Sequence, residues 1–149
     1  MIDEKDKFFM RLCIDEAKKA FDSDEVPVGA VIVRNGEVIA SAHNTRENDK
    51  NALHHAEINA IDEACKKLGG WRLVGCTLYV TLEPCPMCAG AIINARVERV
   101  VFGACDKKAG SFGTMINLTE YPLFKPEICS GVLDTECASL LTDFFKRKR

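Results

Sequence analysis

Residues 76–88 read CTLYVTLEPCPMC, and this stretch determines the architecture into which the rest of the chain fits. Cys76 to Thr81 is a short run of apolar and β-branched residues, which predicts a strand. The run ends at Pro84, and we expect a helix to begin at Cys85. A second apolar run, Arg99 to Gly103, follows that helix and predicts the next strand. This order implies a crossover connection and a sheet with helices on both faces, which is an α/β fold.

The segment upstream of this unit predicts a β-hairpin preceded by a helix. Asn35-Gly36 is a strong signal for a two-residue turn, and the apolar runs Val28 to Val33 and Glu37 to Ala42 flank it. Before the hairpin, Asp3 to Phe21 has apolar residues at helical spacing on one face. These patterns place a helix and two antiparallel strands before the central unit.

The remaining segments complete a single domain over residues 1–149. A polar loop, Asn44 to Asn51, leads into an expected helix from about His54 to Leu68. Downstream, residues 104–126 contain Gly and Pro and match no regular pattern. Glu127 to Leu133 is a candidate fifth strand, and Asp134 to about Lys146 predicts a final helix. The chain has no repeats, low-complexity segments or linker that would divide it.

Composition and charge restrict the class of protein. The chain is 47% hydrophobic and 28% charged, as in ordinary soluble globular proteins, and no apolar run approaches the roughly 20 residues of a membrane helix. The N-terminus does not resemble a secretory signal, so we expect a cytoplasmic protein. A net charge of −2 provides no general attraction for nucleic acid. Lys146 to Arg149 is a candidate basic contact for nucleic acid, but its charge alone favours a solvated helix end that complements the helix dipole.

The eight cysteines fall into two groups. Six are scattered singly among apolar neighbours, and we expect them to be small buried hydrophobes; they are Cys13, Cys65, Cys76, Cys105, Cys129 and Cys137. The other two, Cys85 and Cys88, form a C-x-x-C at an expected helix N-terminus, where the dipole favours thiolates. By itself C-x-x-C also fits a redox pair or half of a structural zinc site. A catalytic zinc site needs only three protein ligands, which suits the few histidines available.

The third ligand is expected to be His55, because a carboxylate follows it in His55-Ala56-Glu57. Residues two apart on a regular helix point in nearly opposite directions, so both face one metal only if His55 lies at the edge of the helix. Glu57 would then approach the metal without binding it. We expect His54 to have no metal role and His43 to be a strand-end residue.

The combined pattern, H-x-E followed by P-C-x-x-C, is the signature of zinc-dependent base deaminases. Hydrolytic deamination needs a hydroxide at neutral pH, and zinc supplies it by lowering the pKa of water to about 7. The reaction also needs one group that takes the proton, protonates the ring nitrogen and then protonates the departing ammonia. Glu57 is the candidate for this catalytic role.

The sequence resembles the cytidine deaminase-like superfamily in these two motifs, and its bacterial tRNA-specific adenosine deaminase branch over nearly the whole chain. The stretches that carry the second resemblance are Glu25 to Val31, His43-Asn44-x-Arg46, Thr81 to Cys85, Val101 to Asp106, and Cys137 through Phe145. The resemblance implies a three-layer α/β/α sandwich around a five-stranded mixed sheet, and a homodimer with one Zn²⁺ per subunit. It also implies conversion of the wobble adenosine to inosine in a tRNA anticodon stem-loop.

The resemblance further implies a set of substrate-binding residues. Asn44 would contact the flipped nucleoside, and Asp106 would lie near the ribose 2′-hydroxyl. Without the resemblance, Asn44 is a loop-capping residue and Asp106 a polar residue that ends a strand. Val28 and Leu82 would form walls of the base pocket, although their pattern alone places them in the core. Ala56 belongs to the same expected set.

The resemblance places Phe145, with Lys146 to Arg149, where the last helix meets the anticodon loop, with the ring stacking and the cations pairing with phosphates. One departure is that the family often has Asn-His-Arg before its fifth strand, where this chain has Phe124-Lys125-Pro126. This departure affects contacts to flanking nucleotides and not the metal or Glu57.

Three alternatives remain open from sequence. One is a deaminase of a free base or nucleoside, such as guanine, cytosine or cytidine, which the acidic net charge favours. Another is a binding module stabilised by metal, without catalysis, which leaves Glu57 unexplained. A third is iron in place of zinc, although thiolate and imidazole ligands with tetrahedral preference favour zinc.

Overall fold

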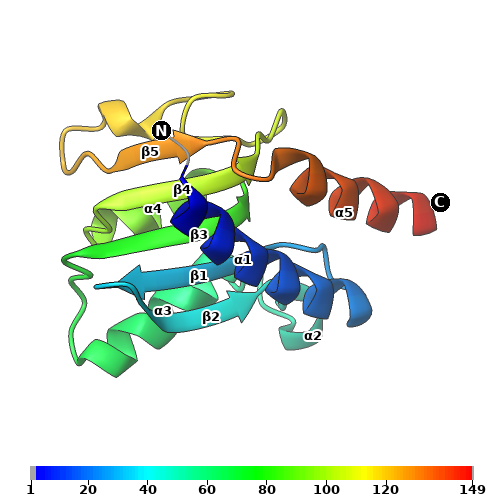
Figure 1. Ribbon diagram of the computed structural model, residues 1–149, viewed down its shortest axis with the longest axis horizontal. Coiled ribbons are helices and arrows are strands. Elements are labelled where there is room, and N and C mark those ends of the chain that lie inside the picture. The colour runs from blue at the N-terminus through cyan, green and yellow to red at the C-terminus, as the bar shows by residue number, and fades with distance from the viewer. Residues whose placement is uncertain (1–2, 149) are drawn as a thin grey trace.

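The computed structural model describes residues 3–148, which form a five-stranded mixed sheet between two layers of helices (Figure 1). The spatial order of the strands is β2-β1-β3-β4-β5. β1 pairs antiparallel with β2 and with β3, while the pairs β3 with β4 and β4 with β5 are parallel. This is the expected three-layer α/β/α architecture.

Residues 3–148 contain five strands, five α-helices and one 3₁₀ helix. The strands are β1 (Gly29–Arg34), β2 (Glu37–His43), β3 (Cys76–Leu82), β4 (Arg99–Ala104) and β5 (Glu127–Ser130). The helices are α1 (Glu4–Asp22), α2 (Arg46–Asp49), α3 (Ala56–Leu68), α4 (Pro86–Asn94), the short 3₁₀ helix η1 (Leu118–Glu120) and α5 (Asp134–Arg147). Among them, no helix has the length and apolarity that crossing a membrane requires.

The two faces of the sheet bury separate apolar cores, because successive residues of a strand point to opposite sides. Val31 and Val101 face α1 and α5, where they join a cluster that includes Met10. Ile32 and Val100 face the other side and pack with residues of α3 and α4. In Figure 1, α1 crosses in front of the sheet, α5 extends to the right of it, and α3 and α4 lie behind it. The sheet is therefore covered on both faces, as parallel strands require.

The hairpin has the predicted turn. Asn35 and Gly36 both have positive φ, 52° and 76°, as a type I′ turn requires. The candidate fifth strand is shorter than expected and ends at Ser130 instead of Leu133. The backbone turns away there, because Gly131 and Leu133 have φ values of 83° and 52°, in the left-handed region.

Two local expectations need correction. The segment expected to be a polar loop contains the four-residue helix α2, whose amides bind a carboxylate distant in sequence, Glu25. Among the six scattered cysteines, Cys105 is exposed, and Cys65 and Cys129 are only partly buried. The other three, Cys13, Cys76 and Cys137, are buried in the two cores as expected.

One edge of the sheet gathers the segments that carry the predicted motifs. Leu82 at the end of β3 pairs with Ala104 at the end of β4, and Ala30 at the start of β1 pairs with Val80. Helices α3 and α4 begin at this same edge. There the side chain of His55, at the start of α3, contacts Cys85 and Cys88 at the start of α4. The chain thus brings residues 28, 44, 55–57 and 82–88 together.

Candidate active site

The predicted metal ligands come from the starts of two helices. His55 is the N-cap residue of α3, with extended backbone (φ −72°, ψ 160°), and Cys85 is the N-cap residue of α4 (φ −75°, ψ 173°). Pro86 occupies the first helical position of α4, where its missing N–H costs nothing, and Cys88 follows in the same turn. His55 therefore lies at the helix edge, the one position from which it and Glu57 can face the same point.

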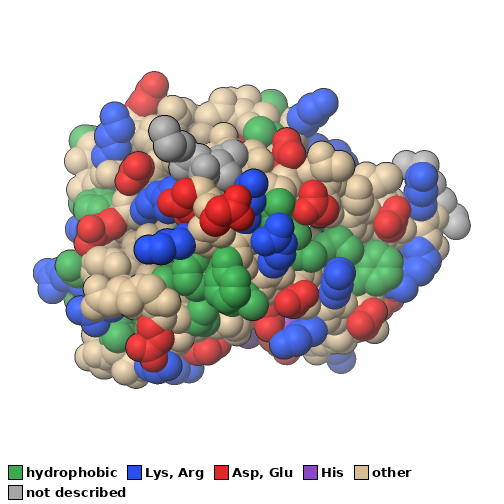
Figure 2. Space-filling view, in the orientation of Figure 1, with side chains coloured by type: hydrophobic (Ala, Val, Ile, Leu, Met, Phe, Trp, Pro, Cys, Tyr) green, Lys and Arg blue, Asp and Glu red, His purple; other side chains and the backbone are tan. Residues whose placement is uncertain are grey.

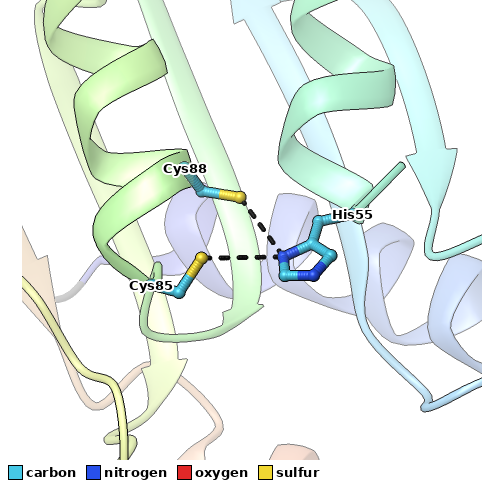
Figure 3. A group of neighbouring side chains, drawn as sticks. All are labelled: His55, Cys85 and Cys88. Atoms are coloured by element: carbon cyan, nitrogen blue, oxygen red, sulfur yellow. Dashed lines mark hydrogen bonds between the residues drawn. The ribbon is translucent and has the colours of Figure 1, made fainter. Parts of the chain in front are cut away.

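The three side chains point toward one another (Figure 3). Nδ1 of His55 is 3.6 Å from Sγ of Cys85 and 3.5 Å from Sγ of Cys88, and all three atoms lie within 4.8 Å of one another. Tetrahedral zinc with Zn–N of about 2.0 Å and Zn–S of about 2.3 Å separates these atom types by about 3.5 Å. A single ring nitrogen carries at most one hydrogen, so its equal approach to two sulfur atoms fits a shared ion better than two hydrogen bonds. The donor set fits zinc.

The protonation state of Cys85 suits a metal. A hydrogen bond from the Cys88 thiol, supported by His55, lowers the pKa of Cys85 to about 4, so Cys85 is a thiolate at neutral pH. The hydrogen bond to Cys85 raises the pKa of His55, and the same thiol pair raises the pKa of Cys88. Thiolate is the form of cysteine that binds metal.

Glu57 lies in the first turn of α3 and is almost fully buried, with 4% of its surface exposed. Burial raises the pKa of its carboxyl to about 7. The side chain faces the same pocket as His55 and Cys85. A buried carboxyl beside a metal-binding cluster has the placement of a general acid and base.

A pocket that opens to solvent lies beside the cluster, with His55, Glu57 and Cys85 in its lining. Five expected substrate residues line it: Asn44, Ala56, Val28, Leu82 and Asp106. The structure thus brings these five to the cluster. Three further residues line the pocket and were not among the expected substrate-binding residues: Val26, Arg46 and Glu83.

The loop that carries Asn44 is held by a buried carboxylate. Asn44 donates to the carbonyl of Val26 at 3.2 Å and accepts from the amide of Arg46 at 3.2 Å, so its side chain performs the loop role inferred from composition while it lines the pocket. Glu25, fully buried, accepts from the amides of Glu47 at 2.9 Å and Asn48 at 2.7 Å. These bonds fix the backbone on one side of the pocket.

Phe145 does not line the pocket; it is an exposed residue of α5. In the basic cluster next to it, Lys148 pairs with Asp24 at 2.6 Å, and Arg147 approaches the same carboxylate at 3.4 Å. Arg149 lies outside the described residues. This arrangement agrees with the simpler interpretation of the cluster as a helix end, and Phe145 remains a predicted RNA contact.

The other two histidines lie where the sequence placed them. His43 ends β2 and bonds Glu16 of α1 at 3.0 Å. His54 precedes the N-cap of α3 and bonds Asp49 at 2.7 Å. Neither belongs to the three-residue cluster, so His55 is the histidine of this site.

Comparison with known proteins gives a consistent result. Residues 3–104 match the family described as the cytidine and deoxycytidylate deaminase zinc-binding region. The chain is 56% identical over 147 residues to the tRNA-specific adenosine deaminase of Bacillus subtilis, a match that covers 97% of this chain and 91% of the relative.

Two solved structures extend the comparison. One comes from a study of A-to-I editing by tRNA:A34 deaminases at the wobble position of transfer RNA. It has a TM-score of 0.87 and 43% identity, and the match covers 90% of this chain and 99% of that one. A guanine deaminase from Bacillus subtilis has a TM-score of 0.66 and 32% identity, with 83% and 73% covered. The similarity is thus greater to the tRNA-acting structure.

Proposed function

The chain belongs to the cytidine and deoxycytidylate deaminase family, and from this membership we propose that it hydrolyses the 6-amino group of adenosine at the wobble position of a tRNA anticodon, forming inosine and ammonia. The observation that carries the proposal is the convergence of His55, Cys85 and Cys88, together with a pocket that His55, Cys85 and the buried Glu57 line. The family resemblance and the 56% identity to a tRNA-specific adenosine deaminase select the substrate.

Each residue has a distinct part in this mechanism. His55, Cys85 and Cys88 would hold one Zn²⁺ per subunit. When bound, zinc acts as a Lewis acid and makes water acidic enough to supply a nucleophile near neutral pH. Glu57 takes the proton from the attacking water on a carboxylate oxygen. It delivers this proton to N1 of the adenine ring and then takes the hydroxyl proton to the departing amino group, so ammonia leaves and Glu57 is restored.

The pocket walls support the choice of a nucleoside. Val28 and Leu82 are apolar and suit the faces of a base, while Asn44 and Asp106 are polar and suit the sugar and base edges. Deaminases that act on nucleic acid take the target base out of the stack, and a concave pocket with these walls can receive it.

The net charge of −2 favours local contacts with RNA over a broad basic surface. Figure 2 shows acidic and basic side chains interspersed on the face covered by α1 and α5. We therefore propose that Phe145 and the basic end of α5 provide a limited contact with the anticodon stem-loop, in which phosphates compete with Asp24 for Lys148.

A homodimer in the cytoplasm completes the proposal. Four large apolar side chains of one segment are exposed to solvent, and a partner subunit would bury them; they are Met115, Ile116, Tyr121 and Leu123. Sedimentation equilibrium would give twice the chain mass if this is correct. The cytoplasm follows from the proposed substrate, since tRNA is used there.

The proposal is tested by inosine formation in an anticodon stem-loop with the sequence ACG, with a Glu57→Ala variant run alongside. Inosine at the wobble position only with the intact chain supports both the reaction and the role of Glu57. Free guanine, cytosine and cytidine are assayed in parallel, because the chain also resembles a guanine deaminase at 32% identity. Turnover of these small substrates alone would contradict the tRNA proposal.

A further inference from the structure

Glu83 is a buried acidic residue that the mechanism above does not use. It follows the last residue of β3, lies two positions before Cys85, and is 1% exposed. Within residues 3–148, no Lys or Arg makes an ion pair with it. A buried carboxyl without a cation requires other partners, and the identity of those partners indicates what the residue does.

All partners of the Glu83 carboxyl come from one loop, residues 105–117. Oε1 accepts from the amide of Asp106 at 3.1 Å and from Oγ1 of Thr114 at 2.5 Å. Oε2 accepts from the amides of Phe112 at 3.0 Å and Thr114 at 3.2 Å. Four donors and no acceptor thus surround one carboxyl group, and the loop folds around it.

The rest of the loop is built for this close approach. A methyl group at Gly110 would collide with the Glu83 carboxyl and with the carbonyl of Asp106, so only glycine fits there. The amide of Gly110 donates to Asp106 at 2.9 Å, and the amide of Ser111 donates to Pro84 at 3.0 Å. The carboxyl is therefore the centre around which this segment is ordered.

This loop forms a wall of the pocket through Asp106. The Asp106 side chain is itself fixed, because its Oδ1 accepts from the amides of Lys108 at 2.9 Å and Ala109 at 3.2 Å. Because Glu83 is joined to Cys85 through Pro84 alone, the loop is held in register with the cluster of His55, Cys85 and Cys88.

We propose that Glu83 is a positioning residue for substrate: through its four hydrogen bonds it holds the Asp106 wall at a fixed distance from the cluster of His55, Cys85 and Cys88, and it acts on substrate through that wall. The inference rests on the proposed deaminase function of the same pocket. Glu25 orders the Asn44 loop, another part of the pocket lining, through two backbone amides in the same way.

Two substitutions test the role from opposite sides of the contact. Glu83→Gln keeps the shape of the side chain but places an NH₂ donor against backbone donors, and Gly110→Ala pushes the loop away while the carboxyl is retained. Matched controls are Glu37→Gln and Gly70→Ala, since Glu37 is exposed and a methyl at Gly70 meets nothing within 4 Å.

We expect both test variants to retain zinc and to raise KM for the anticodon stem-loop about 10-fold or more, while kcat per zinc-loaded chain stays within about threefold. A purely structural role would lower the active fraction and leave KM unchanged. Wild-type KM in Glu83→Gln, or a loss of activity that parallels loss of zinc in both variants, would overturn the proposal.

Amide hydrogen exchange of the wild-type chain provides a measurement that needs neither substrate nor a folded variant. The amides of Asp106, Phe112 and Thr114 should exchange at least about 10-fold more slowly than that of Lys107, which has no partner within residues 3–148. Equal rates would refute the anchoring role. A wild-type chain that is inactive on the stem-loop would contradict the proposed function alone, because the exchange rates would still decide the role of Glu83.

Discussion

Sγ of Cys85 lies 3.6 Å from Nδ1 of His55, and each of these residues is the N-cap of its own helix. The two residues are 30 positions apart in sequence, so only the folded sheet with its two helices brings them together. Their extended N-cap backbones direct both side chains out of the helices toward one point. The site is thus a product of how α3 and α4 begin at the same edge of the sheet.

The first prediction concerns Glu57, the residue that we propose transfers protons. Glu57→Gln should lower the rate of inosine formation by about 10²- to 10⁴-fold, because the amide cannot accept and return a proton. Zinc content and the unfolding midpoint should remain close to wild type. Glu63→Gln, an exposed position on the same helix, is the control and should retain full activity. Activity in Glu57→Gln within about threefold of wild type would rule out the assigned role.

The second prediction concerns the metal ligands. Cys85→Ala and Cys88→Ala should each lose most of the zinc measured by elemental analysis, because two remaining ligands hold the ion weakly. Their thermal unfolding temperatures should fall as well, since an ion held by this cluster would join α3 to α4. Cys105→Ala removes an exposed cysteine outside the cluster and should change neither quantity. Full zinc occupancy in either ligand variant is the result that contradicts the assignment.

The third prediction concerns pH. Asp6, 1% exposed, accepts from Arg99 at 2.9 and 2.8 Å and from the hydroxyl of Tyr79 at 2.8 Å. The hydrogen bonds from Arg99 hold the pKa of Asp6 below its usual range. Its stabilising contribution is therefore complete above the unfolded-state pKa of about 3.9 and is lost as the pH falls through the lower pKa of the folded state.

Urea unfolding at several pH values checks this contribution. Asp6→Asn should lower the free energy of unfolding by about 3 kcal/mol at pH 7, because it leaves Arg99 without its partner. The difference from wild type should shrink below about pH 4. The control is Asp62→Asn, which breaks an exposed pair with Lys66 and should cost no more than about 0.5 kcal/mol. A difference that does not vary with pH would exclude ionised Asp6 as its source.

The fourth prediction concerns the packing of α1 on the sheet. A methyl group at Gly29 would meet the backbone of Cys13 and Ala17 and the Cβ of Glu16. Gly29→Ala should therefore destabilise the fold by about 1–3 kcal/mol or more, measured by urea unfolding. Gly90→Ala adds the same group where nothing lies within 4 Å and should be neutral or slightly stabilising. Equal stability of the two variants would mean that α1 can shift at little cost.

Local patterns in the sequence were sufficient to predict the strands, the main helices and the cluster. The Asn35-Gly36 turn and the apolar runs on both sides need no distant contact, and the structure has them. The start of α3 was expected about two residues early, because His55 is an N-cap whose side chain makes no capping bond. Such boundaries depend on backbone angles that residue types constrain only weakly.

The features that the sequence did not reveal depend on distant contacts. Helix α2 is bound by Glu25, about 20 residues earlier, and residues 105–117 fold around Glu83. Neither carboxylate differs in local pattern from an exposed glutamate. For the same reason Arg46 and Glu83 were missed as pocket residues. The exposure of Cys105, next to the end of β4, likewise has no local signal.

The pocket is built from two kinds of segment, helix starts and loops. His55 and Cys85 lie at helix starts that pack on the sheet. Two parts of the pocket lining belong to loops, one held by hydrogen bonds to Glu25 and the other by hydrogen bonds to Glu83. Mutations that reshape a wall therefore leave the reactive groups in place. We therefore expect substitutions in the two wall loops to change which substrate is recognised while the groups at the helix starts keep their positions.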